Sequence, residues 1–213
     1  MSTNILGDPE ALRELWCGPL ADLVVKLTGK DGPRWEQALK RMLHSSLEVA
    51  NFKTWRMIKL HTDIKDADGF REALKKVTCG IGNLGNDILG KPAFTMSREE
   101  KVLELVVTSN VELGFPGGAK VKQTYARAKE LGLELCPSEV GPQLCLQYTD
   151  QPKGEWLLIA MEPITDSGGN LNVFYVECRD VGRQWLDGCD GGPDSFWRGP
   201  YRWVFVRGNC PRI

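Results

Sequence analysis

The most distinctive side chains lie in the last third of the sequence, where aspartates are interleaved with aromatic residues in a glycine-rich stretch. Four of the seven tryptophans fall in this third, and Phe196 accompanies them. Aromatic faces beside carboxylates suit a polar, ring-shaped ligand or an anchor point for a partner protein. The candidate ligand-binding residues are Trp185, Asp187, Asp190, Asp194, Trp197 and Tyr201. In the alternative interpretation, Trp156 and Trp203 belong to a sheet core and residues 187–200 form a surface turn.

A second candidate is a nucleic-acid-binding helix pair at residues 119–147. Helix, short turn and helix, followed by a hairpin, is the order of winged-helix proteins, in which the second helix reads the DNA major groove. The basic candidates are Lys120, Lys122, Arg127 and Lys129, with further basic residues from 53–76. The second helix carries Glu139 and no lysine or arginine. Contacts to phosphate groups dominate the affinity of proteins for nucleic acids. Because the second helix has no cation to make them, nucleic-acid binding is possible but not favoured.

Three glycines, Gly80, Gly82 and Gly85, form the pattern GxGxxG. In dinucleotide-binding folds this pattern follows a buried strand and places a pyrophosphate at a helix N-terminus. Here the preceding segment, residues 70–77, is charged and has a helical pattern. We therefore expect the glycines to end one helix and to lead through a loop into another near Asn86.

Catalytic and metal-binding patterns are sparse, and whether the protein is an enzyme stays open. The only histidines are His44 and His61, which limits schemes that pair histidine with serine or cysteine. No two of the seven cysteines stand at CxxC spacing, so we expect free thiols, no metal site and no cofactor. An acidic site in residues 187–194 would support a hydrolase of unknown class as a further alternative.

Composition and charge exclude several classes of protein. The chain has 213 residues, 42% of them apolar, and a net charge of −1, which is typical of a folded globular protein and not of a nucleic-acid coat protein. Residues 1–98 carry a net +3 and residues 99–213 a net −4. No segment approaches the roughly 20 apolar residues of a membrane span. Without a signal-peptide pattern, and with cysteines expected to be free, we expect a cytoplasmic protein that does not bind membranes.

The hydrophobic pattern changes near residue 97. The first half shows short helical patterns and one short strand near 54–60, which predicts a mainly helical region over 1–96. Residues 97–213 show the helix pair at 119–147 and antiparallel strands within 155–207, among them a weaker one around Trp185. We predict an α+β fold in which a helical N-terminal half precedes two helices packed on an antiparallel sheet of three to five strands.

Residues 130–148 (ELGLELCPSEVGPQLCLQY) and 150–174, which include GEWLLIAMEPI, resemble a group of uncharacterised hypothetical proteins from uncultured bacteria. The resemblance extends back to LGKPAFT at 89–95 and forward to WVFV at 203–206. It implies a bacterial, cytoplasmic protein and brings no activity, cofactor or site residue.

Taken together, these patterns favour a non-enzymatic binding or protein-interaction module whose partner is a protein or a small polar ligand. A nucleic-acid-associated protein and a hydrolase stay as alternatives. The oligomeric state does not follow from the sequence.

Overall fold

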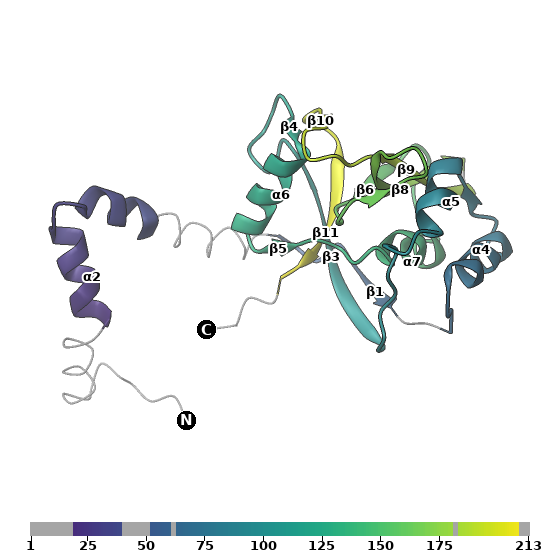
Figure 1. Ribbon diagram of the computed structural model, residues 1–213, viewed down its shortest axis with the longest axis horizontal. Coiled ribbons are helices and arrows are strands. Elements are labelled where there is room, and N and C mark those ends of the chain that lie inside the picture. Colours follow the sequence, from purple (N-terminus) through teal and green to yellow (C-terminus); the bar gives the residue numbers. More distant parts are fainter. Residues whose placement is uncertain (1–18, 40–51, 61–62, 181–182, 209–213) are drawn as a thin grey trace. The chain divides into compact units, whose positions relative to one another are not determined.

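The computed structural model describes residues 19–39, 52–60, 63–180 and 183–208 of a chain that divides into two compact units, Met1–Glu48 and Val49–Ile213 (Figure 1). In the first unit, α2 (Pro19–Thr28) is followed by a second helical segment at 32–39. The Lys26 ammonium lies 4.8 Å from the centre of the Trp35 ring. Both histidines, His44 and His61, lie outside the described residues.

The second unit is built on one curled, mixed sheet of nine strands. Seven strands follow the order β1-β3-β11-β6-β8-β9-β2, while β5 pairs with β11 and β7 pairs with β8. Neighbours are antiparallel except for β11 with β6 and β9 with β2. The strands are β1 (Arg56–Leu60), β2 (Gly80–Ile81), β3 (Lys101–Ser109), β5 (Leu133–Glu134), β6 (Trp156–Ile159), β7 (Ile164–Thr165), β8 (Leu171–Asp180), β9 (Arg183–Asp190) and β11 (Arg202–Arg207). Separately, β4 (Ala119–Lys120) pairs with β10 (Phe196–Trp197).

Four short helices accompany the sheet, and they do not all cover the same face. They are α4 (Ala67–Lys76), α5 (Asn83–Leu89), α6 (Val121–Glu130) and α7 (Val140–Gln147). In Figure 1, α4, α5 and α7 gather at one end of the sheet, and α6 lies at the other with the β4–β10 pair. Alternation along β11 gives the sheet two apolar faces that helices can cover, because Trp203 and Phe205 point to one face and Val204 to the other.

One sheet face packs against α6 and the other against α7. Tyr125 of α6 contacts Trp203 and Phe205 with ring centres 5.7 and 6.2 Å apart. On the opposite face, the ring of Phe174 from β8 packs so closely on Gly141 of α7 that a side-chain carbon there would lie 2.9 Å from it. We call these the α6 face and the α7 face.

The predicted fold class is wrong. The structure contains a nine-stranded mixed sheet and six short helices in its described parts, in place of a helical half beside three to five antiparallel strands. Strands from both halves share the sheet, since β1 pairs with β3, and two neighbouring pairs are parallel. The helix pair is also separated: α6 and α7 cover opposite faces, so they do not form a winged-helix unit.

The apolar segments of the second unit form a core between the sheet and its helices. The buried core holds Phe70 of α4, Leu144 of α7 and the central strand residues Leu158 and Trp203. Within the described ranges, no helix has the length and hydropathy needed to cross a membrane. Cys79, Cys136, Cys145, Cys178 and Cys189, which lie in those ranges, are free thiols, and all but Cys189 are buried.

Candidate ligand-binding site

Four aromatic side chains gather on the α6 face near the middle of the sheet. Leu158 of β6 pairs with Trp203 and with Tyr175 of β8, so Trp156, two residues earlier on β6, shares their face. The ring centre of Trp156 lies 4.9 Å from that of Tyr175, 5.6 Å from Trp197 and 5.2 Å from Tyr201. We call Trp156, Tyr175, Trp197 and Tyr201 the aromatic cluster.

The rings of the aromatic cluster pack directly on one another. Trp197 and Tyr201 meet with ring centres 5.0 Å apart and planes at 83°, an edge-to-face contact that favours aromatic pairs. At this separation no cation fits between two rings, so the cluster is not a cage for an ammonium group. A ligand would instead stack on its outer faces, of which Tyr201 is 37% exposed.

A pocket of about 670 Å³ opens beside the aromatic cluster, and we call it the aromatic pocket. Its lining consists of Pro152, Lys153, Gly154, Glu155, Trp156, Arg198, Pro200, Tyr201 and Arg202. Small-molecule sites occupy about 300–1,000 Å³ and combine an apolar wall with a few polar groups. Here Trp156 and Tyr201 supply the wall, and four charged side chains supply the polar groups.

Glu155 is held rigidly at this pocket by two strong donors. Its Oε1 accepts a hydrogen bond from Nη1 of Arg202 at 2.7 Å, and its Oε2 accepts one from the Tyr148 hydroxyl at 2.7 Å. The carboxylate side chain is 11% exposed. Burial, followed by the contact with Glu155, raises the pKa of Tyr148, so this hydroxyl stays a donor at neutral pH. Glu155 and Arg202 therefore form a neutral, preorganised pair.

The loop that carries Trp197 and Tyr201 is fixed by Asn110, a fully buried residue that follows β3. Its side-chain Nδ2 donates to the Trp197 carbonyl at 3.0 Å, and its Oδ1 accepts from the Thr124 hydroxyl of α6 at 2.9 Å. In addition, the Val111 N–H donates to the Gly199 carbonyl at 3.1 Å. These bonds hold the aromatic residues in place before any ligand binds.

The predicted candidates separate into two groups. Trp197 and Tyr201 belong to the aromatic cluster, and Tyr201 lines the aromatic pocket. Trp185 does not line that pocket: a side-chain carbon at Gly80 would be 2.1 Å from its ring, and the Arg179 guanidinium lies over the ring, 4.1 Å from its centre. Trp185 thus packs β9 against β2.

Asp187 caps a helix. The first residue of α5 follows Gly82, which has no side chain to cap the helix, and Asp187 Oδ1 accepts the Gly85 N–H at 2.8 Å. This is the bond that an N-cap side chain normally makes. Gly82 leaves room for the carboxylate, because a side-chain carbon there would lie 1.9 Å from Asp187 Oδ2. The GxGxxG segment therefore binds the chain's own carboxylate where a nucleotide fold would bind a phosphate.

Asp190 and Asp194 make internal contacts of a different kind. Asp190 accepts the Gly192 N–H at 3.0 Å and thereby shapes the turn before β10. Asp194 pairs with Lys120 at 3.0 Å and with Lys122 at 2.8 Å, and these two lysines lower its pKa. The three carboxylates predicted for a hydrolase site thus have separate partners and form no acid–base pair.

Three of the four basic candidates, which lie on β4 and α6, have acidic partners. Lys120 and Lys122 share Asp194, and Arg127 pairs with Glu130 at 3.2 Å. Lys129 is exposed. These surface pairs leave α6 without a concentrated positive face, which nucleic-acid affinity requires.

A serine, lysine and aspartate meet where α5 approaches the turn between β7 and β8. The Ser167 hydroxyl donates to Asp87 Oδ1 at 2.7 Å and accepts from Lys91 Nζ at 2.6 Å. The backbone N–H and the hydroxyl of Ser167, followed by Lys91, lower the pKa of Asp87 to about 2. Asp87 is then too weak a base to activate the serine. The cluster joins α5 to the turn.

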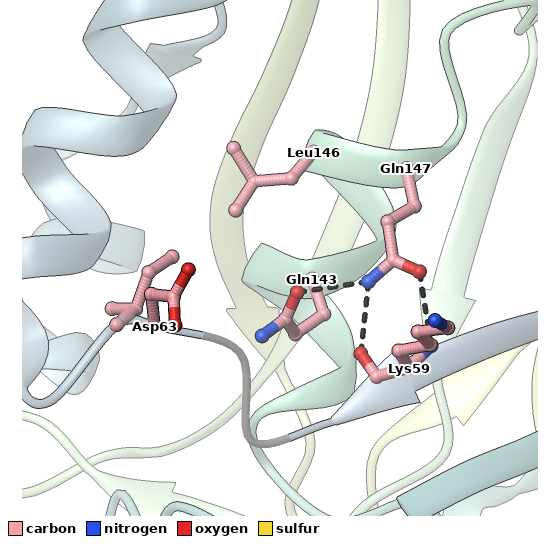
Figure 2. Close-up of a pocket in the computed structure, with 6 residues that line it drawn as sticks. Lys59, Asp63, Gln143, Leu146 and Gln147 are labelled. Atoms are coloured by element: carbon pink, nitrogen blue, oxygen red, sulfur yellow. Dashed lines mark hydrogen bonds between the residues drawn. The ribbon is translucent and has the colours of Figure 1, made fainter. Parts of the chain in front are cut away.

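A second pocket, of about 460 Å³, lies between α7 and the end of β1 (Figure 2). Gln147 donates to the Lys59 carbonyl and accepts the Lys59 N–H, each at 2.9 Å, and it also donates to Gln143 at 2.9 Å. Figure 2 shows one of these bonds running along α7 to Gln143 and two reaching the Lys59 backbone, with Asp63 on the other side of the pocket. Gln147 thus acts as a partner for the edge strand, and its amide is occupied.

Comparison with known proteins yields no match among family models, curated proteins or solved structures. The geometry of the aromatic pocket is therefore the basis for a functional interpretation.

Sequence reasoning missed most of the lining of the aromatic pocket. Glu155 and Arg202 pair across two strands that are parallel neighbours, and Arg198 lies in the loop between the predicted aromatic residues. The usable signal was Trp156, which continues the aromatic pattern. Asn110 gave no signal, because a single buried amide has no sequence pattern.

Proposed function

We propose that this protein is a non-enzymatic binding protein that holds a small, polar, ring-shaped ligand in the aromatic pocket. The observation that carries the proposal is the wall formed by Trp156 and Tyr201 in a pocket of about 670 Å³ that also bears charged groups. Planar aromatic faces bind rings by stacking, and a few fixed polar groups orient the ligand.

The rigidity of the pocket supports this proposal. Asn110 fixes the loop between β10 and β11, and Arg202 and Tyr148 fix the Glu155 carboxylate. Binding at a preformed site loses little free energy to the ordering of side chains. A cytoplasmic location belongs to the same proposal, with the free thiols as its support.

The test is a titration of the full chain with three neutral ring compounds, benzamide, adenosine and cellobiose, followed by tryptophan fluorescence and protein NMR. We expect saturable binding of at least one compound, with a Kd between about 10 μM and 10 mM. Tyr201→Ala and Trp156→Leu should each weaken that binding at least about fivefold, since one stacked ring contributes roughly 1 kcal/mol or more.

Trp35→Leu is the matched control, because Trp35 is a partly exposed tryptophan of the first unit and does not line the pocket. A thermal melt of each variant confirms that it is folded. The proposal would be refuted if none of the three compounds bound and if benzoate and adenosine 5′-monophosphate, the charged counterparts of benzamide and adenosine, also failed to bind. Binding that is unchanged in both pocket variants would refute it as well.

A further inference from the structure

The lining of the aromatic pocket holds more positively than negatively charged side chains. Glu155 is the acidic residue of the lining, and its carboxylate is fully engaged by Arg202 and Tyr148. Lys153 and Arg198 are additional cations of the lining. The lining therefore carries a positive excess, which favours a negatively charged ligand group.

Arg198 is the cation most available to such a group. It is exposed, and within the described part of the chain its guanidinium is in no ion pair. Lys153 pairs with Asp180 at 3.1 Å, but the two side chains are 62% and 61% exposed. Exposed pairs of this kind are weak, so a bound anion can recruit Lys153 as well.

Arg198 places its positive charge next to the aromatic wall of the pocket. It stands between Trp197 and Tyr201 in the loop that Asn110 fixes, and with Tyr201 and Trp156 it lines one pocket. A guanidinium presents a planar set of donors that binds carboxylate and phosphate oxygens in pairs. The loop thus offers a stacking face and an anion-binding group to a single small molecule.

We infer that the ligand of the aromatic pocket is a planar ring compound with an anionic group, with the ring on Trp156 and Tyr201 and the carboxylate or phosphate at Arg198. The inference rests on the proposed function and narrows its ligand class. Lys153, whose side chain is 62% exposed, assists as a second cation, and the Glu155–Arg202 pair forms part of the pocket lining.

The experiment compares two pairs of compounds that differ mainly in charge. Benzoate and benzamide test a carboxylate, and adenosine 5′-monophosphate and adenosine test a phosphate. Titrations at about 20 mM salt should show the anion of at least one pair binding at least about tenfold more tightly than its neutral partner. Raising the salt to about 200 mM should reduce this preference, since screening weakens exposed charge pairs.

Arg198→Gln should lower the affinity of the preferred anion more than that of its neutral partner and so remove most of the anion preference, and Lys153→Gln should remove a smaller part of it. Arg98→Gln removes the same charge from another exposed arginine, before β3, and should change neither affinity. Arg98 is distant from the aromatic pocket. It precedes the first residue of β3, whereas Arg202 of the pocket pairs with Ser109, the last residue of that nine-residue strand.

The outcomes separate the two proposals. Equal binding of neutral and charged partners, or an anion preference that survives both Arg198→Gln and Lys153→Gln, would overturn the anionic ligand class and leave the binding pocket intact. A complete lack of binding would overturn the proposed function itself.

Discussion

The substitution Gly85→Ala tests whether α5 lies directly on β9. Gly85 is buried, and a side-chain carbon at this position would be 2.7 Å from the Asp187 Cα and 3.0 Å from the Leu186 carbonyl oxygen. Both are backbone atoms of a strand paired on both sides, so the strand cannot yield by changing a rotamer. The helix would have to move away from the sheet.

The free energies can be compared directly. Alanine favours a helix over glycine by about 1 kcal/mol, which alone would stabilise the variant. Against this, overpacking costs about 3 kcal/mol, and loss of the bond from the Gly85 N–H to Asp187 costs about 1 kcal/mol. We expect a net loss of about 3 kcal/mol, which corresponds to a decrease in Tm of roughly 6–12 °C for a chain of this size.

The assay is urea unfolding followed by tryptophan fluorescence, with thermal unfolding as a second measurement. Gly117→Ala is the matched control, because no heavy atom lies within 4 Å of a side-chain carbon at Gly117, and its stability should stay within about 0.5 kcal/mol of the parent chain. A Gly85→Ala variant as stable as the parent chain would show that the gain in helix propensity outweighs any overpacking, and that α5 does not lie as close to the β9 backbone as described.

Three further substitutions test other contacts. Asp187→Ala should cost about 1 kcal/mol in urea unfolding, because α5 loses the carboxylate that caps it; an unchanged midpoint would contradict the capping role. The pKa of Asp87, about 2 when folded, lies below its ordinary value of 3.8, so its stabilising effect is present above pH 4 and is lost as the pH falls from about 4 to about 2. Asp87→Asn should therefore flatten the dependence of the urea midpoint on pH over that interval, and identical curves would refute this assignment. Gln147→Leu should cost about 1 kcal/mol and increase self-association in light scattering, because the N–H and carbonyl of Lys59 on an edge strand lose their partner; a stable monomer would argue against that role.

The longer strands were predictable and the shorter ones were not. The apolar runs that became β6, β8 and β11, and the weaker segment that became β9, were identified from alternation and β-branched residues. In contrast, β2, β5 and β7 have two residues each, too few for any period to appear. The parallel pairing of β11 with β6 joins distant segments, and local patterns do not encode it.

The candidate site was predictable in part for the same reason. Trp197 and Tyr201 carry a local aromatic signal, and both belong to the aromatic cluster. Asp187 carries an equally clear local signal, yet its partner, Gly85, is 102 residues away. Its role as a helix cap follows only from the tertiary structure. Composition indicated which residue types are unusual, and distant contacts decided what each of them does.

The central place of β11 also constrains the order in which the chain can fold. β11 lies between β3 and β6, although both of these strands precede it in the sequence. During synthesis, at about 5–20 residues per second, β3 and β6 therefore leave the ribosome before the strand that joins them exists. Until residues 202–207 emerge, their edges stay open to pairing with other chains. We expect assembly of the sheet to be a late step that completes only when β11 inserts.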